Sequence, residues 1–272
     1  MHNLAVSNIA WTGNNHTVLS KIREHGITGV EVALGKIASW EELTKDKVKD
    51  YRSMCEDYGL TIPSFQAFLF GKPDLQLLGD QANFDQLLHH LEHVADMAYA
   101  AGARVLVFGA PSNRRLCGYT ATEALRLAEE RLFKMAAVAH ERNATIGLEA
   151  VPRVYGEELI TSYLLSMGLV ERVNHPGLSF HLDSGATFMN NDDVSEAVVK
   201  FSDRVCHFHI SQPNLENFSK PASYHPSAAE ALRTTNYNRW SCIEMRESDD
   251  SLASIIEACD YVNQVYAKGH AW

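Results

Sequence analysis

The sequence contains few cysteines and no cysteine motif. Five cysteines occur among 272 residues, an odd number, and no two of them have Cys-x-x-Cys spacing. They are Cys55, Cys117, Cys206, Cys242 and Cys259. A disulfide-held secreted domain and a cysteine-caged metal site both need paired or clustered cysteines. The pattern argues against both and fits a reducing compartment.

Long apolar runs are also missing. No run approaches the ~18 residues that a membrane-spanning helix needs. The N-terminal stretch MHNLAVSNIAW has no basic segment followed by an apolar one, so it does not resemble a signal peptide. Neither a Pro/Gly/Ser-rich linker nor a charge run divides the chain. We therefore expect a soluble cytoplasmic protein that folds as one domain over residues 1–272.

Positive charge is in the minority. The chain has 24 Lys and Arg against 34 Asp and Glu, which gives a formal net charge of −10. Such a balance repels a phosphate backbone and an anionic membrane surface, so neither nucleic acid nor membrane is an expected partner. The hydrophobic share of 46% is ordinary for a globular protein that buries a full core. A homo-oligomer is compatible with this composition.

Short apolar stretches alternate with amphipathic ones along the whole chain. The predicted strands are Leu4–Ile9, Gly29–Leu34, Ile62–Phe68, Arg104–Phe108, Thr145–Ala150, Leu178–Leu182, Val205–Ile210 and Ser241–Met245. The predicted helices are Thr17–Glu24, Lys45–Tyr58, Asn83–Ala101, Thr120–Glu141, Glu157–Val173, Asp193–Phe201, Ser227–Thr234 and Asp249–Ala267. Eight strand and helix pairs in about 250 residues indicate an α/β fold, the (β/α)8 TIM barrel.

Four consecutive predicted strands each end in a residue of a type that commonly binds metal ions. They are Glu149, Asp183, His209 and Glu244, while Glu31 and Gln66 take comparable places on earlier strands. In a (β/α)8 barrel these positions converge at the C-terminal mouth. Three carboxylates and an imidazole would repel or lose solvation there without a cation. We therefore expect one divalent metal ion, Mn²⁺, Mg²⁺ or Co²⁺, with Zn²⁺ also suited to this donor set.

The segments around these residues carry a family resemblance. IGLEAVP, LSFHLDSG, CHFHIS and WSCIEMR, together with VSNIAW, GVEVA, VLVFGAPSNR and HPSAAEALR, resemble the xylose isomerase-like TIM barrel superfamily of sugar and sugar phosphate isomerases and epimerases. The resemblance covers essentially the whole chain. It implies that Glu149, Asp183, His209 and Glu244 bind one divalent cation and that the two glutamates also move protons. Ketose 3-epimerases belong to this superfamily.

Two departures from the relatives limit what the resemblance implies. Ketose epimerases usually carry a substrate-binding His three residues after the metal Asp and an Arg six residues after the metal His. This chain has Ala186 and Leu215 there, so hexulose specificity does not transfer. Apurinic-site endonucleases of the superfamily need further histidines for three zinc ions. Gln66 and Gly109 occupy the corresponding strand ends, so we expect no apurinic-site cleavage.

The predicted reaction is a metal-dependent isomerisation or epimerisation of a small sugar, sugar phosphate or related polyhydroxy carbonyl compound. A metal that chelates a carbonyl and its neighbouring hydroxyl stabilises the enediolate formed when a base removes the α-proton. Glu149 and Glu244 are the candidate bases. Opposite placement would give epimerisation, whereas one base acting on a single face would give aldose–ketose isomerisation. A keto-sugar or keto-cyclitol dehydratase and a non-catalytic sugar-binding protein are the alternatives.

Further side chains are candidates for substrate contact. They are Gln66, Asn113, Arg114, Arg246, Trp11 and His181. Asn113 and Arg114 belong to a basic loop suited to a phosphate or carboxylate, or simply to solvent. Arg246 could bind an anion or pair with a metal carboxylate, and Trp11 could stack on a sugar or plug the barrel rim. His181 is expected one layer below the metal, as a hydrogen-bonding partner or a core histidine.

Overall fold

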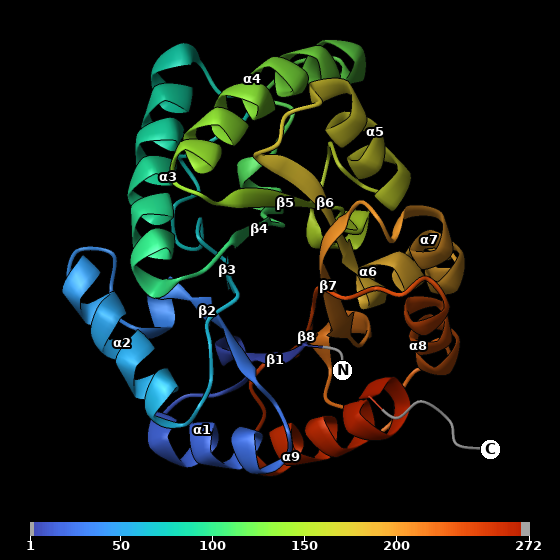
Figure 1. Ribbon diagram of the computed structural model, residues 1–272. Helices are drawn as coiled ribbons and strands as arrows, with labels where there is room; N and C mark the ends of the chain where they lie inside the picture. Colours follow the sequence, from blue (N-terminus) through green and yellow to red (C-terminus); the bar gives the residue numbers. More distant parts are fainter. Residues whose placement is uncertain (1–2, 268–272) are drawn as a thin grey trace.

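A computed structural model describes residues 3–267 and shows a closed barrel of eight parallel strands (Figure 1). Each strand pairs with the next along the chain, and β8 pairs with β1. The strands are β1 (Asn3–Ser7), β2 (Gly29–Ala33), β3 (Ser64–Gln66), β4 (Val105–Phe108), β5 (Thr145–Glu149), β6 (Leu178–Asp183), β7 (Val205–Ser211) and β8 (Trp240–Glu244). The predicted barrel and its eight strands are confirmed.

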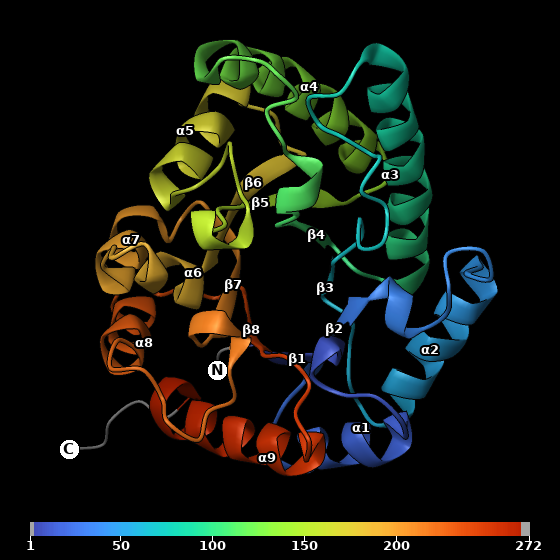
Figure 2. The ribbon, with the colours of Figure 1, turned by 180° about the vertical axis from the view of Figure 1, so that it is seen from behind.

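Helices surround the barrel as an outer ring (Figures 1 and 2). They are α1 (Asn15–Glu24), α2 (Lys45–Asp57), α3 (Gln81–Ala101), α4 (Ala121–Glu141), α5 (Tyr163–Val173), α6 (Ser184–Met189), α7 (Val194–Phe201), α8 (His225–Thr234) and α9 (Ser251–Val262). Most begin at a side chain that accepts a backbone N–H, such as Thr120 before α4, which forms a capping box with Glu123. Such caps satisfy backbone N–H groups of the first turn and so define where a helix begins.

The strands are buried on both faces, as parallel strands covered by helices must be. All five residues of β2 are buried, although the fragment GVEVA contains a glutamate. Val30 and Val32 are completely buried. Glu31, between them, lies inside the barrel against His207 and His209 of β7. Alternation along the strand therefore separates an apolar outer face from a polar interior.

Three predicted elements differ most from the structure. The helix predicted over Glu157–Val173 begins only at Tyr163, because the Glu157 carboxylate accepts hydrogen bonds from the backbone of Leu159 and Ile160 and holds that stretch in a turn. The strand predicted over Ile62–Phe68 contains only Ser64–Gln66. The last predicted helix ends its α-helical part at Val262 and continues as a π-helical turn, Asn263–Ala267.

The extra helix α6 was not predicted. Ser184–Met189 form it directly after β6, and the Asp183 side chain accepts a hydrogen bond from the Ala186 N–H at its first turn. None of the helices in residues 3–267 is long and apolar enough to cross a membrane. Because those residues do not include the whole chain, the single domain over residues 1–272 stays a prediction.

Candidate metal centre and active site

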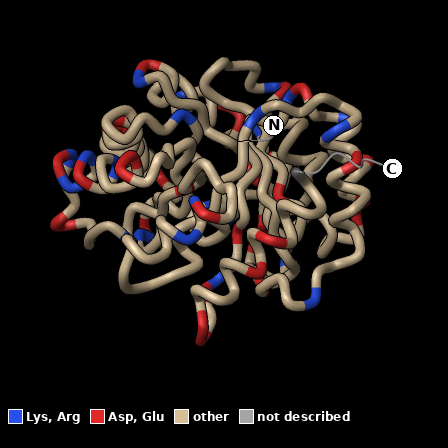
Figure 3. The backbone as a smooth tube through the Cα atoms, turned by 60° about the horizontal axis from the view of Figure 1, so that its bottom comes forward, with Lys and Arg blue, Asp and Glu red and all other residues tan. Residues whose placement is uncertain are grey.

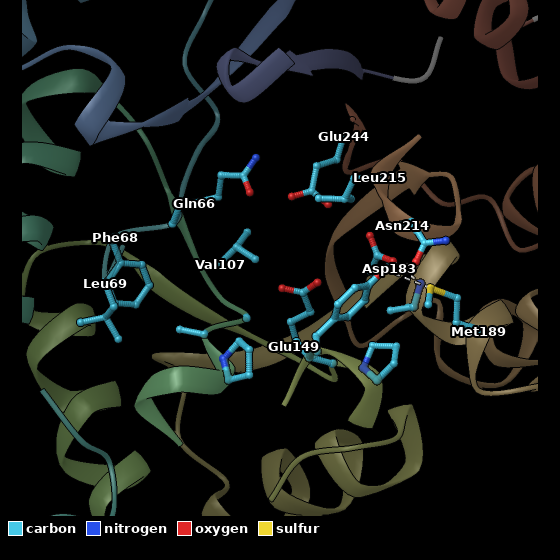
Figure 4. Close-up of a pocket in the computed structure, with 18 of the residues that line it drawn as sticks. Gln66, Phe68, Leu69, Val107, Glu149, Asp183, Met189, Asn214, Leu215 and Glu244 are labelled. Carbon is cyan, nitrogen blue, oxygen red and sulfur yellow. Dashed lines mark hydrogen bonds between the residues drawn. The ribbon is translucent and has the colours of Figure 1, made fainter. Parts of the chain in front are cut away.

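A cavity opens at the C-terminal ends of the strands. Its volume is about 280 Å³, and its lining comes from β3, β4, β5, β6 and β8 and from the segments that follow β3 to β7. The carboxylates of Glu149, Asp183 and Glu244 face the cavity from three different strands (Figure 4). These three carboxylates therefore converge at the barrel mouth, as the order of the strands predicts.

His209 lies beneath these carboxylates. Its Nδ1 atom is 3.1 Å from Oε2 of Glu244 and 3.6 Å from Oδ2 of Asp183, and it makes no hydrogen bond. Asp183, His209 and Glu244 each offer one donor atom within 4.8 Å of the others, and Glu149 offers one within the same distance of His209 and His181. We refer to Glu149, Asp183, His209 and Glu244 as the quartet.

The orientation of His209 is set from below by Glu31. The Nε2 atom of His209 lies 3.0 Å from Oε1 of Glu31, and the Nε2 atom of His207 lies 2.9 Å from Oε2 of the same carboxylate. Ser64 adds a hydroxyl donor at 2.7 Å. With Nε2 turned to Glu31, His209 presents Nδ1 to the cavity, which is the arrangement of a metal-binding histidine held by a carboxylate.

Asp183 is held in a comparable way. Its Oδ2 atom accepts a hydrogen bond from the Ser211 hydroxyl at 2.7 Å, and Oδ1 accepts one from the Ala186 N–H at 2.5 Å. Ser211 also accepts from the Gly185 N–H at 2.9 Å. The start of α6 therefore fixes the Asp183 carboxylate at the cavity floor.

The electrostatics of the quartet fit a cation. Burial and the neighbouring Asp183 and Glu244 charges raise the pKa of Glu149 well above its ordinary value. Burial likewise raises the pKa of Glu244. Burial opposes charge on His209, yet the Glu244 and Glu31 carboxylates raise its pKa well above the usual range. These carboxylates are costly to ionise together, and the Nδ1 atom of His209 lacks a partner; a divalent cation would answer both.

Glu31 was noted in the sequence as a polar strand-end residue, but its contact with His209 was missed. The contact becomes visible only in the tertiary structure, where side chains of β2 and β7 meet inside the barrel. Tyr155 and Asn214 were missed as well: both line the cavity, and the Tyr155 hydroxyl donates to Oδ1 of Asn214 at 3.1 Å. They belong to irregular segments after β5 and β7, which carry no periodic signal in the sequence.

Asn113 and Arg114 do not reach the cavity. Asn113 is 2% exposed and donates to the backbone carbonyls of Lys72 and Leu75, both at 2.7 Å. Arg114 is fully buried against Glu157, with Nε 2.9 Å from Oε2, and it donates to the Glu149 carbonyl at 2.7 Å. The prediction of substrate contact disagrees with this placement, since a buried guanidinium finds its partners within the protein.

Two other predicted contacts also lie outside the cavity, and a third lies beneath it. Trp11 is buried in the core and donates from Nε1 to Asn15 at 2.8 Å, so it plugs the rim. Arg246 is exposed and lines a separate surface cleft. His181 is 1% exposed with both ring nitrogens unpartnered, stacked 5.5 Å from His207. Gln66 alone of the predicted substrate contacts lines the cavity, with its amide nitrogen bonded to Ser7.

The same fold occurs in known proteins. The profile of the xylose isomerase-like TIM barrel family matches residues 19–265. The chain belongs to this family. D-Psicose 3-epimerase from Clostridium cellulolyticum H10 superposes with a TM-score of 0.83 at 14% identity, over 97% of this chain and 99% of that one. Curated protein sequences gave no match.

Other solved members of the family share the fold at similar identity. An L-ribulose 3-epimerase gives a TM-score of 0.82 at 15% identity, covering 98% of this chain and 95% of that one. The family 2 AP endonuclease from Brucella melitensis gives 0.75 at 17% identity, over 94% and 97%. Because these identities are low, the likeness shows the xylose isomerase-like barrel and leaves the chemistry to be argued from the site.

Gly109, directly after β4, allows Glu149 to occupy its position. A Cβ atom at residue 109 would lie 1.6 Å from Oε2 of Glu149. We expect Gly109→Ala to fold, because a carboxylate tip can move, and to weaken metal binding at least tenfold. Isothermal calorimetry with Mn²⁺ measures this. Gly35→Ala is the control, since nothing lies within 4 Å of its Cβ; equal affinity in both variants would contradict the expectation.

The Arg114–Glu157 pair predicts a stability effect. Both side chains are fully buried, and Arg114 also joins the ends of β4 and β5 through the Phe108 and Glu149 carbonyls. We expect Arg114→Met to lower the free energy of unfolding by about 3–5 kcal/mol, because it leaves a buried carboxylate unpaired. Urea unfolding measures the loss. Adding Glu157→Gln should recover part of the lost stability. A double variant that loses as much unfolding free energy as the two single variants together would speak against a paired interaction.

Proposed function

We propose that this protein is a divalent-metal-dependent isomerase or epimerase of a small polyhydroxy carbonyl compound. The observation that carries the proposal is the quartet itself: three carboxylates and an unpartnered imidazole nitrogen converge at the barrel mouth. Active sites of this fold lie at that end. The structurally similar proteins include psicose, ribulose and 3-keto-glucoside epimerases, which agrees with this chemistry.

The quartet would hold one cation, Mn²⁺, Mg²⁺ or Co²⁺, with Zn²⁺ also suited. When bound, it would neutralise the negative charge that develops on the substrate oxygens after a C–H proton is lost. Glu31 and Ser211 orient His209 and Asp183 for this task. The donor groups found in residues 3–267 all include His209, which supports one centre rather than three.

Glu149 and Glu244 are the proposed bases. They enter the cavity from β5 and β8, and Figure 4 shows their carboxylates on different sides of it. Burial raises the pKa of each, which suits a carboxylate that must accept and return a proton. One glutamate removes the proton from a substrate carbon and the other delivers a proton to the opposite face, so this placement favours epimerisation.

Charge gives no support for a nucleic-acid substrate. Lys and Arg are spread among Asp and Glu along the backbone, rather than gathered in one region (Figure 3). A net charge of −10 disfavours association with a phosphate backbone. We therefore propose a carbohydrate-like small molecule as the partner.

Exchange with heavy water tests the proposal directly. The Mn²⁺-loaded protein is incubated in D₂O with ketoses, aldoses, cyclitol ketones and their phosphates, and deuterium at carbon is followed by NMR. We expect exchange with at least one compound and its loss after metal removal. An enone product would identify a dehydratase instead. Tight binding without any exchange would identify a binding protein, and either result overturns the proposal.

A further inference from the structure

The cavity has a polar side and an apolar side. Phe68 and Leu69, which follow β3, and Val107 of β4 line the part of the cavity that Figure 4 shows on the left, next to Gln66 and away from Asp183 and Glu244. We refer to these three residues as the apolar wall. Each is at most 3% exposed, so the wall is a fixed part of the packed barrel.

The apolar wall offers no free backbone acceptor at its two loop residues. The Phe68 carbonyl accepts a hydrogen bond from Nε2 of His90 at 2.7 Å, and the Leu69 carbonyl accepts from the Lys72 N–H at 3.0 Å. A substrate hydroxyl packed there would lose its water without gaining a partner. A methyl or methylene group placed there would instead gain from burial.

Positive charge is absent from the described cavity lining, which contains no Lys or Arg. Arg114, near the ends of β4 and β5, is paired with buried Glu157, and Arg246, two residues after Glu244, is exposed and lines the separate surface cleft. The charged side chains of the lining are instead the carboxyl groups of Glu149, Asp183 and Glu244. An anionic group packed inside the cavity would meet these carboxyl groups and no counter-charge among the described lining residues.

We propose that the substrate is an uncharged carbonyl compound whose far end is deoxygenated, as in a deoxyketose, and that this end packs on the apolar wall. The inference rests on the proposed function, because the quartet must hold the oxygen-bearing end for the other end to reach Phe68 and Leu69. It excludes sugar phosphates, which the reaction class alone would allow.

Matched compounds test the inference on the Mn²⁺-loaded full chain. The probes are ketohexoses, the 6-deoxyketohexoses of the same configuration and the corresponding 6-phosphates, compared by deuterium exchange and by calorimetric binding. We expect the 6-deoxy member to exceed its hydroxylated partner about 10–100-fold in kcat/KM and in affinity. The phosphates should neither exchange nor bind. Equal or better performance by the hydroxylated or phosphorylated member overturns the inference.

A substitution in the apolar wall tests whether the wall causes the preference for the deoxy compound. Val107→Thr is nearly isosteric and places a hydroxyl in the cavity, so it should reduce the preference for the deoxy compound at least severalfold. Val199→Thr, on the exposed face of α7, is the control and should leave the preference unchanged. An unchanged preference in Val107→Thr counts against the wall as its origin.

The two proposals can fail separately. If no probe exchanges deuterium, the proposed function is contradicted, and binding alone then decides the substrate inference. Tighter binding of the 6-deoxy probe supports it in that case. Binding of none of the probes overturns it.

Discussion

We expect Glu149→Gln and Glu244→Gln each to lower turnover by about 10²–10⁴-fold while the barrel still folds. Glutamine keeps the shape of glutamate but cannot accept a proton at the pH of the reaction. Both side chains line the open cavity rather than the apolar layers, so their loss of charge does not disturb core packing. Turnover is measured at saturating metal, because both variants also lose a metal ligand.

The stereochemistry of exchange sharpens this test. If each glutamate serves one face of the substrate, each single variant keeps solvent exchange on the face of the surviving carboxylate and loses it on the other. Glu257→Gln, at an exposed position of α9, is the matched control. Near-normal turnover of both active-site variants with metal bound would show that the bases lie elsewhere.

Metal binding should stabilise the folded protein strongly. The quartet forms only when four strands meet, so a cation binds the native state and not the unfolded chain. At a free Mn²⁺ concentration of about 100 times Kd, linkage adds about 2.7 kcal/mol to the free energy of unfolding. We expect a clear rise in Tm on addition of Mn²⁺ or Co²⁺ and its reversal by a chelator.

Substitutions of the proposed metal ligands show whether the rise in Tm comes from metal binding at the quartet. Asp183→Ala and His209→Ala should abolish the metal-dependent rise in Tm, whereas Asp203→Ala and His89→Ala, at exposed positions, should retain it. Elemental analysis of protein purified without chelator gives an independent measure, with one cation expected per chain. A wild type that stays metal-free when Mn²⁺, Co²⁺ and Zn²⁺ are each supplied would remove the basis of the metal centre.

The glutamates are the best example of what local sequence could predict. Glu149 and Glu244 each follow an apolar residue at the end of a short strand, and a parallel barrel brings all strand ends to one mouth. Their position at the cavity therefore followed from strand order and alternation alone. Arg114 shows the opposite case, since a basic loop residue after a strand is compatible both with a substrate contact and with a buried ion pair.

The sequence by itself determined the number and order of the strands, the helices other than α6, and the convergence of four candidate metal-binding side chains. These follow from hydrophobic periodicity, caps and alternation over short stretches. Only the tertiary structure decided which side chains contact one another around the cavity. Glu31 lies under His209, and Glu157 neutralises Arg114, through contacts between residues 178 and 43 positions apart in the chain. The apolar wall likewise arises where the segment after β3 meets β4. Such pairings depend on barrel closure and loop path, which no local pattern encodes.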